Sequence, residues 1–206
     1  MIMKTKLFAL IFGSILFASC QQKEMKISRS DFSVVTEMTD FSPAYILKNE
    51  EGKVEIKKNS LIGNTHWVLS VDRDLMLNEV APFLHELTEK KHKVGGMHED
   101  TKDIYFVYSD TVHKQNAYVK MPFKKITIEV PPEVEPEMDV RYLHGAIADL
   151  EDFRQKFSKS EAIKEPYRLI FFAFSKKMKV EEFVNILIEL EKQKISESLN
   201  SEVYVN

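Results

Sequence analysis

The sequence predicts an α+β fold, with a mixed sheet and about three helices. Short runs rich in β-branched and aromatic residues alternate with longer stretches in which apolar residues recur at intervals of three and four. The 206-residue chain is 44% hydrophobic and 30% charged, so it carries enough apolar material for a buried core. Both observations favour a globular domain in which helices pack on a sheet.

The first twenty residues form a pattern of their own. Lys4 and Lys6 precede a nearly uninterrupted apolar run at 7–18, which is shorter than the roughly 20 residues that a membrane span requires. Small residues follow at 18–19, and then Cys20, the only cysteine of the chain. We therefore predict that residues 1–19 are a cleaved signal peptide.

The stretch LFASCQQKE around Cys20 resembles the lipobox of bacterial lipoproteins, in which a signal peptidase cuts before the cysteine and its sulfur is acylated. Phe17 stands where these proteins usually carry Leu. The resemblance implies lipidation at Cys20, which makes the lipid bilayer a partner. Because no Asp follows Cys20, it implies an outer-membrane anchor, with the domain facing the periplasm or the cell surface. The alternative is a plain secretory signal that happens to end near a cysteine.

Charge and cysteine content exclude some function classes. Removal of residues 1–19 leaves 27 basic and 32 acidic residues. A mildly acidic chain without a basic run offers no electrostatic case for nucleic acid as a partner. A single cysteine allows no internal disulfide.

Residues 20–41 are polar and irregular, and we predict that they form the lipidated N-terminus and a tether. A first α+β unit is expected at 42–130. It opens with a β-hairpin whose two arms flank a turn that contains Gly52. The remaining elements expected there are a strand at 67–71, a helix at 75–90 that contains Pro82, and strands at 104–108, 118–121 and 125–130.

Residues 131–138 are rich in Pro and Glu, which predicts a stiff connector. A second α+β unit is expected at 139–206. Its elements are an amphipathic helix at 139–157, a buried strand at 169–174, a second amphipathic helix at 180–192 and a short closing strand at 203–205.

Two segments of the chain match without a gap at an offset of 103 positions, 67–91 over 170–194. The identical positions in the first copy are Glu79, Leu84, Glu86, Leu87 and Lys91. Two interpretations remain open. The chain holds two strand–helix–strand repeats, or two amphipathic helices that each follow a strand are alike by chance.

The residues VDRDLMLNEV at 71–80, which lead from a strand into a helix, resemble the periplasmic domain of the ExbD/TolR biopolymer-transport family. SKKMKVEEF at 175–183 is a looser second match. The resemblance implies a small periplasmic module that associates with itself or with other envelope components. The transmembrane helix and proton-carrying Asp of that family are replaced here by the lipoprotein-like signal, and no glycine follows Glu191. A proton-motive role is therefore not implied.

No motif predicts an active site. His85 and Glu86 begin like a zinc-protease helix, but position 89 is Glu and the second histidine is missing. The acidic turn at 72–74 lacks the glycine and the further oxygen ligands of a calcium loop. Nucleophile-elbow, phosphate-loop and paired-cysteine patterns are absent from the sequence. We therefore expect a protein that is not an enzyme and carries no cofactor.

Two pairs of residues remain candidates for binding. His92 and His98 flank the glycines at 95–96 and could together hold a metal or haem, although lone loop histidines are usually only polar surface residues. Tyr105 and Tyr118 belong to neighbouring expected strands and could present rings to a partner, the alternative being core packing. The predicted function is a membrane-anchored bacterial envelope lipoprotein with a non-catalytic binding or assembly role, in an ExbD/TolR-like module. The alternative is a metal- or haem-capturing lipoprotein that uses His92 and His98.

Overall fold

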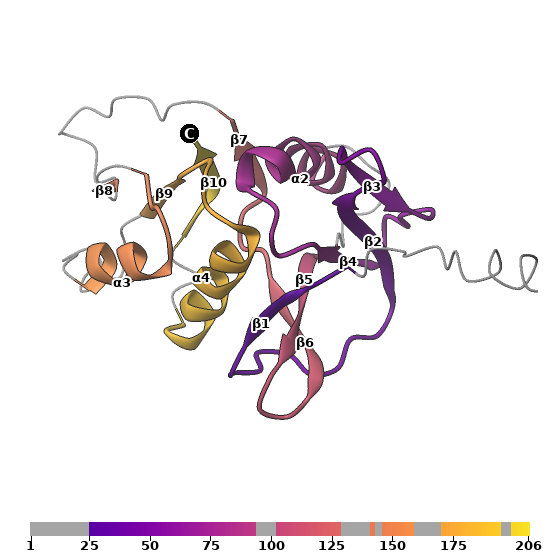
Figure 1. The fold of residues 1–206 in the computed structure, drawn as a ribbon, viewed down its shortest axis with the longest axis horizontal. Coiled ribbons are helices and arrows are strands. Elements are labelled where there is room, and N and C mark those ends of the chain that lie inside the picture. Colours follow the sequence, from indigo (N-terminus) through magenta and orange to yellow (C-terminus); the bar gives the residue numbers. More distant parts are fainter. Residues whose placement is uncertain (1–24, 94–101, 129–140, 143–145, 159–169, 195–198) are drawn as a thin grey trace, which may run out of the picture.

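The computed structural model describes residues 25–93, 102–128, 141–142, 146–158, 170–194 and 199–206. In these ranges the chain forms three helices and ten strands, which build two sheets around one apolar core. The predicted α+β class with a mixed sheet is therefore confirmed (Figure 1). The helices are α2 (Leu77–Lys91), α3 (Leu150–Ser158) and α4 (Val180–Lys192).

The first sheet is organised around its strand β5. β6 pairs with β5 along one edge, antiparallel. The other edge is shared, because β4 pairs with the first half of β5 and β1 pairs with the second half, both in parallel. β2 continues the sheet beyond β4, and β3 closes it. The strands are β1 (Ser28–Ser30), β2 (Phe41–Lys48), β3 (Val54–Lys58), β4 (His66–Val71), β5 (Ile104–Asp110) and β6 (Gln115–Lys120).

β2 and β3 form the hairpin that the sequence predicts. The carbonyl of Asn49 accepts the Gly52 amide at 3.0 Å, and Gly52 has a φ of 80°, a conformation that favours glycine. The Asn49 side-chain oxygen also accepts the amides of Glu51 and Lys53, each at 3.0 Å. Local hydrogen bonds of this kind explain why the turn was readable from sequence.

The second sheet has the order β7-β10-β9-β8, with every pair parallel. β7 belongs by sequence to the first predicted unit, yet it pairs with β10. The division expected at residues 131–138 therefore does not separate the two sheets, and the whole of that connector lies outside the described residues. The strands are β7 (Lys125–Thr127), β8 (Arg141–Tyr142), β9 (Ile170–Phe174) and β10 (Leu199–Val205).

Each long helix packs on the sheet that the other helix's repeat builds. α2 contacts β7 and β10 of the second sheet and also β3 at the edge of the first, whereas α4 contacts β1 and β6 of the first. Phe183 of α4 joins the two sheets, because its ring meets Phe106 of β5 at 5.8 Å and Phe174 of β9 at 5.2 Å between centroids, both edge to face. Apolar residues of both sheets form one continuous core, so the two predicted units fold as a single body.

The turns that lead into α2 and α4 pair with each other. Met76 and Lys179 form an antiparallel bridge, and four backbone hydrogen bonds surround it. The four bonds form two pairs, and the members of each pair are related by the offset of 103. In the first pair, the Leu77 amide donates to the Met178 carbonyl (2.8 Å) and the Val180 amide donates to the Leu75 carbonyl (2.9 Å). In the second pair, the Asn78 amide donates to the Lys176 carbonyl (3.0 Å) and the Glu181 amide donates to the Arg73 carbonyl (3.2 Å). Exchange of the two copies leaves this pattern unchanged, which favours the internal repeat over a chance likeness of two helices.

The segment predicted to be a tether up to residue 41 joins the first sheet much earlier. Ser28–Ser30 form β1, and further along Val35 bridges to Tyr118 of β6 through backbone hydrogen bonds of 2.8 and 3.1 Å. The pairing uses backbone groups, and the sequence Ser28–Ser30 of β1 has no apolar alternation that would predict a strand. The tether predicted for 20–41 is therefore too long at its C-terminal end.

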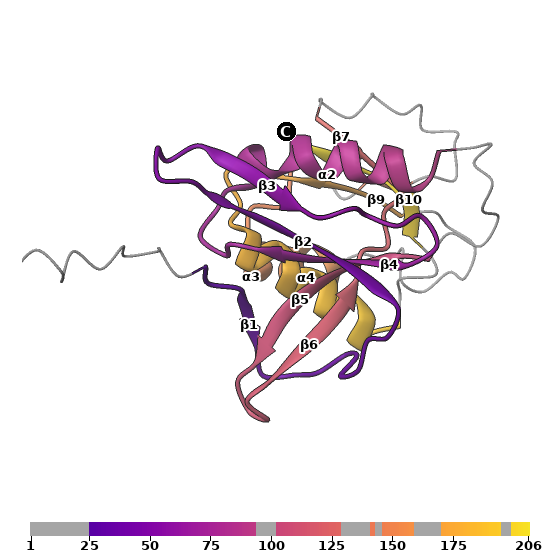
Figure 2. The same cartoon turned by 90° about the vertical axis from the view of Figure 1, so that its right-hand side faces the viewer.

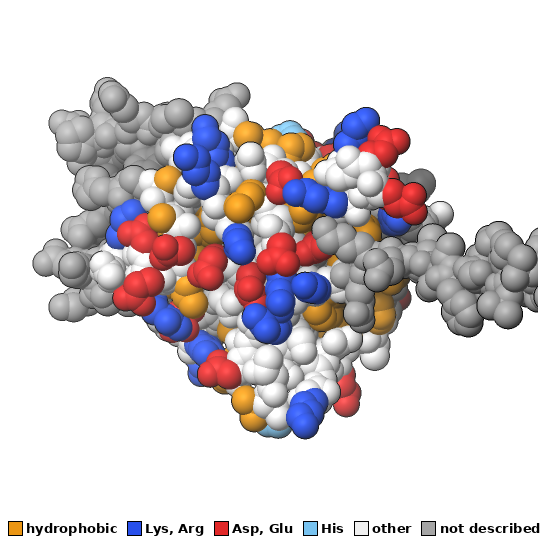
Figure 3. Space-filling view, viewed as in Figure 1, with side chains coloured by type: hydrophobic (Ala, Val, Ile, Leu, Met, Phe, Trp, Pro, Cys, Tyr) orange, Lys and Arg blue, Asp and Glu red, His pale blue; other side chains and the backbone are white. Residues whose placement is uncertain are grey.

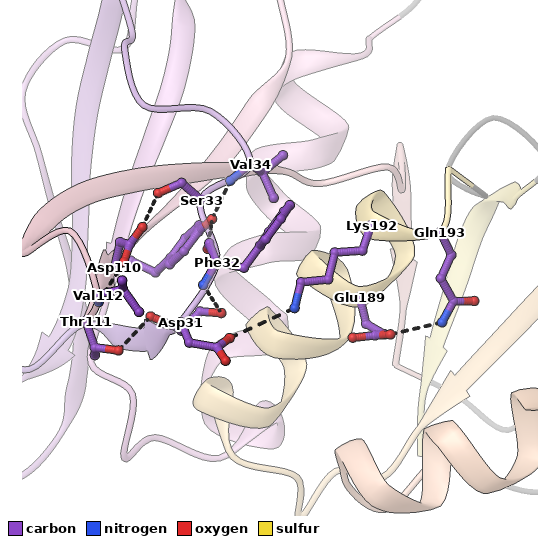
Figure 4. A network of polar contacts seen from close by, with 12 residues as sticks. Asp31, Phe32, Ser33, Val34, Asp110, Thr111, Val112, Glu189, Lys192 and Gln193 are labelled. Carbon is purple, nitrogen blue, oxygen red and sulfur yellow. Dashed lines mark hydrogen bonds and ion pairs between the residues drawn. The ribbon is translucent and has the colours of Figure 1, made fainter.

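Side chains then fasten this segment in place (Figure 4). The buried Tyr108 hydroxyl donates to the Phe32 carbonyl and accepts the Val34 amide, each at 2.9 Å. The Ser33 hydroxyl donates to the buried carboxylate of Asp110. From α4, the Lys192 ammonium lies 4.7 Å from the centre of the Phe32 ring.

The helix expected at 139–157 is shorter in the structure and begins at Leu150. The buried Ile147 instead extends the second sheet, because its amide donates to the Ala173 carbonyl at 2.7 Å. The Asp149 carboxylate accepts the Asp152 amide at 2.9 Å, which is the hydrogen bond of a helix N-cap. α3 therefore starts where a capping residue allows it.

Candidate functional site

The first sheet has one face that no described helix covers. Alternate residues of its strands belong to the core, among them Ile46, Leu69 and Phe106. The residues between them form the opposite surface, which we call the outer face. It comprises Phe41, Pro43, Tyr45 and Leu47 of β2, His66, Val68 and Ser70 of β4, Tyr105 and Val107 of β5, and Tyr118 and Lys120 of β6. Figure 2 views this side of the sheet, with α3 and α4 behind it and α2 along the top.

The outer face is apolar at its centre and charged at its margin. Phe41 and Tyr45 are each 42% exposed, whereas Val68 between the strands is only 4% exposed. Around them, Lys120 pairs with Asp103 at 2.9 Å, and Lys57 pairs with Glu55 at 3.2 Å. An exposed apolar patch within a polar rim is the usual arrangement of a protein-binding surface.

The two tyrosines singled out from sequence both lie on this face. Tyr105 stands opposite Lys120, and Tyr118 stands opposite Val107, so the two rings occupy diagonal positions on neighbouring strands. Both are partly buried. The Tyr105 ring packs edge to face on His66 with centroids 5.2 Å apart, and burial raises the pKa of its hydroxyl.

Phe41 and Tyr45 are the more exposed rings, and neither was predicted as a binding residue from the sequence. The signal was the alternation in FSPAYILK at 41–48, in which Ser42, Ala44 and Ile46 are buried. The first α+β unit was expected to begin at residue 42, which left Phe41 in the tether predicted for 20–41. Recognition of the longer strand would have put both rings on one face.

The predicted metal or haem pair is only half described. His92 is the C-cap of α2, and burial lowers its pKa and favours the neutral imidazole. His98 lies outside the described residues. Among the described residues, no group of three or more His, Cys, Asp and Glu side chains has the arrangement needed to hold a metal ion. His85 has a structural role, since its Nδ1 lies 2.6 Å from the Ile126 carbonyl and joins α2 to β7.

A second cluster of titratable groups lies where α2 ends. Burial lowers the pKa of His66, and its Nδ1 has no hydrogen-bond partner within the described chain. Lys91 is buried and donates to the carbonyls of Gly63 at 2.8 Å and Thr65 at 2.7 Å, with its ammonium 4.7 Å from the centre of the Trp67 ring. Burial lowers the pKa of Lys91 to about 8. These contacts fasten the loop before β4 to α2, which is a structural role.

The predicted lipidation residue Cys20 lies outside the described residues. In the described part of the chain, α2, α3 and α4 all lack the length and apolar character of a membrane span. Comparison of the chain with protein-family models, with curated proteins and with solved structures found no match. Function must therefore be argued from the residues and their arrangement alone.

Proposed function

We propose that the protein is a membrane-anchored bacterial envelope lipoprotein that binds or assembles other envelope proteins and has no catalytic role. The observation that carries the proposal is the outer face of the first sheet, where Phe41 and Tyr45 are exposed beside Tyr105 and Tyr118. Aromatic side chains bury a large area with few rotatable bonds, which is why they dominate the energetics of protein interfaces. The ion-paired margin would form the polar rim of such an interface.

Anchoring is proposed to occur through acylation of Cys20 in the outer membrane, with the domain in the periplasm or at the cell surface. Several acyl chains together give stable attachment, because each buried methylene contributes roughly 0.8 kcal/mol and one chain alone is marginal. The test is fractionation of cells that express Cys20→Ala. We expect the variant to leave the membrane fraction. Retention like that of the wild-type protein would contradict the anchor.

Photo-crosslinking in intact cells tests the partner surface. A photoreactive amino acid in place of Tyr45 should give a defined product with an envelope protein. The matched control carries the same amino acid in place of Lys90, which is also exposed but lies at the end of α2. Identical products from both positions, or none from position 45, would count against the outer face. Phe41→Asp in the protein that carries the photoreactive amino acid at position 45 should abolish the product without lowering the melting temperature by more than a few degrees.

We extend the proposal to an ExbD/TolR-like module that associates with itself or with other envelope proteins. The support is the pairing of two strand–turn–helix copies, in which each turn supplies the hydrogen-bond partners of the other. Sedimentation of the purified protein at several concentrations tests self-association. A monomer at all concentrations would leave only partners of other sequence.

The alternative function, capture of metal or haem through His92 and His98, has one observation in its favour. Burial lowers the pKa of His92, and a metal ligand must be the neutral imidazole. Purified protein that stays colourless with haemin, and whose melting temperature is unmoved by Zn²⁺ or Cu²⁺, would eliminate this alternative. A shift that His92→Ala removes would support it.

A further inference from the structure

The distance between the proposed acylation site and the folded domain is short. Lys26 lies six positions after Cys20 in the chain, and its carbonyl already accepts the Arg73 amide at 2.8 Å. A fully extended chain of that length reaches about 20 Å. A compact domain of roughly 180 residues is about 40 Å across. The domain therefore cannot turn freely above the bilayer, and the surface next to Lys26 must stay close to the lipid.

The fold also prevents the attachment from lengthening. β1 pairs with β5 immediately after Lys26, and the Tyr108 hydroxyl holds the backbone at both Phe32 and Val34. On the same segment, the Arg29 guanidinium pairs with Glu181 of α4 at 3.2 Å. Release of more chain would require these buried and paired contacts to break together.

The surface next to Lys26 consists of the paired turns at 72–76 and 175–179 and the start of β1, which we call the entry face. It carries six cations, Lys26, Arg29, Arg73, Lys176, Lys177 and Lys179, and three carboxylates, Asp72, Asp74 and Glu181. Figure 3 shows acidic and basic side chains gathered together near the middle of the side viewed in Figure 1.

The carboxylates of the entry face are largely taken by three of its cations. Glu181 lies 3.2 Å from Arg29 and 3.7 Å from Arg73, and Asp74 lies 3.8 Å from Lys179. Lys26, Lys176 and Lys177 are exposed and make no ion pair with any described residue. Three lysines without an ion-pair partner among the described residues therefore lie next to the proposed point of membrane attachment.

We propose that the entry face rests on the bilayer and binds anionic lipid headgroups through Lys26, Lys176 and Lys177. The inference rests on the proposed acylation of Cys20, which holds these lysines within reach of the headgroups. Lysines near an anionic membrane are attracted to it over about one Debye length. The opposite end of β1 leads away from the lipid, since the Ser30 carbonyl accepts the Thr111 amide at the tip of the β5–β6 hairpin.

Orientation is tested on the acylated protein in vesicles. Acylation consumes the only cysteine, so an introduced cysteine is a unique site for a fluorophore. Lys177→Cys reports on the entry face, and Val112→Cys, at a position 61% exposed on the hairpin tip, reports on the far end. Lipids with a quencher in the headgroup should quench the label at 177 several-fold more than the label at 112. Equal quenching, or stronger quenching at 112, would overturn the proposed orientation.

Headgroup binding is tested separately on the Cys20→Ala chain without its signal peptide. It should sediment with vesicles of phosphatidylcholine and phosphatidylglycerol but not with phosphatidylcholine alone, and salt should reverse the binding. Lys176→Glu with Lys177→Glu should weaken the binding by more than about 25-fold, because loss of each lysine's attraction alone contributes about fivefold and the new carboxylates add repulsion. Lys90→Glu with Lys124→Glu, an equal change of charge beyond the other end of α2, should leave binding within about twofold. Equal losses in both variants, or no wild-type binding, would overturn the headgroup contact.

These outcomes separate the inference from the proposed function. If Cys20→Ala still fractionates with membranes, the anchor itself is wrong. If the anchor holds while labels at 177 and 112 are quenched alike, only the orientation of the domain is wrong.

Discussion

Met76 and Lys179 pair with each other in an antiparallel bridge, although 103 positions separate them in the chain. Each residue precedes one of the two long helices, so α2 and α4 begin at the same point in the molecule. From there the helices diverge, and each contacts the sheet built by the other copy. The arrangement makes the two copies interdependent, since neither sheet keeps its cover if the other copy unfolds.

Replacement of Phe183 tests this interdependence. We expect Phe183→Ala to lower the free energy of unfolding by about 3–5 kcal/mol, because its ring fills the space between Phe106 and Phe174. Urea unfolding should be followed both by far-ultraviolet circular dichroism and by the fluorescence of Trp67, the only tryptophan, which is buried in the first sheet. Both midpoints should fall together. A variant in which the Trp67 midpoint stayed unchanged would show that the sheets do not share one core.

The hydroxyl of Tyr108 offers a test of the N-terminal attachment. Tyr108→Phe leaves the Phe32 carbonyl and the Val34 amide without their partner, which should cost about 1–3 kcal/mol. The matched control is Tyr45→Phe on the exposed outer face, for which we expect a change below about 0.5 kcal/mol. Limited proteolysis before residue 35 should also become faster in Tyr108→Phe alone. Equal behaviour of the two variants would contradict a fastening role for this hydroxyl.

Asp110 should make stability sensitive to acid. Hydrogen bonds from the Ser33 hydroxyl and from the His113 amide and ring hold the pKa of this carboxyl well below its usual range. A depressed carboxyl pKa stabilises the fold above the unfolded-state value of about 3.9, and this contribution is lost as pH falls towards the folded value. Urea midpoints should therefore fall more steeply below about pH 5 in the wild type than in Asp110→Asn. If the urea midpoints of the two proteins fell equally with pH, Asp110 would not be the source of the acid sensitivity.

Lys91 should act in the opposite range of pH. Burial lowers its pKa to about 8 in the folded protein, against about 10.4 in the unfolded chain, so the unfolded state binds more protons between these values. Stability attributable to Lys91 is therefore highest above about pH 10.4, falls as pH drops from there to about 8, and is constant at lower pH. The free energy of unfolding should rise between about pH 8 and 10.4 in the wild type but not in Lys91→Met, as urea unfolding at several pH values will show. An equal rise in the free energy of unfolding of both proteins would show that groups other than Lys91 cause the pH dependence.

Periodic and local signals made much of the fold predictable from sequence. α4 occupies the range expected from its apolar spacing, 180–192, and the hairpin around Gly52 follows from its turn residues. The elements that were missed depend on distant backbone partners. Neither the polar strand β1 nor the sheet position of Ile147 has a local signature, because each is decided by the edge it pairs with.

The candidate site was partly accessible for the same reason. Alternation along the strands was enough to put Tyr105 and Tyr118 on one face, whereas the exposure of Phe41 depends on how far β2 extends. The sequence did not predict which sheet each helix covers, because α2 and α4 carry similar apolar faces. The backbone pairing of the two turns determines where each helix begins. That these rings bind a partner stays a prediction, as do the roles of Cys20 and His98.

The position of β1 has a consequence for the order of events during folding. Its residues pair with a strand whose hydrogen-bonding groups lie 81 positions further along the chain, as at Ser30 and Thr111. Closing so long a loop carries an entropic cost before the contacts form, so such strands are placed late in folding. β1 can therefore pair only after Thr111, more than halfway along the chain, has been synthesised. Under the proposed acylation of Cys20, a processing enzyme could reach the cysteine before β1 pairs, and the domain would become fixed above the proposed anchor only afterwards.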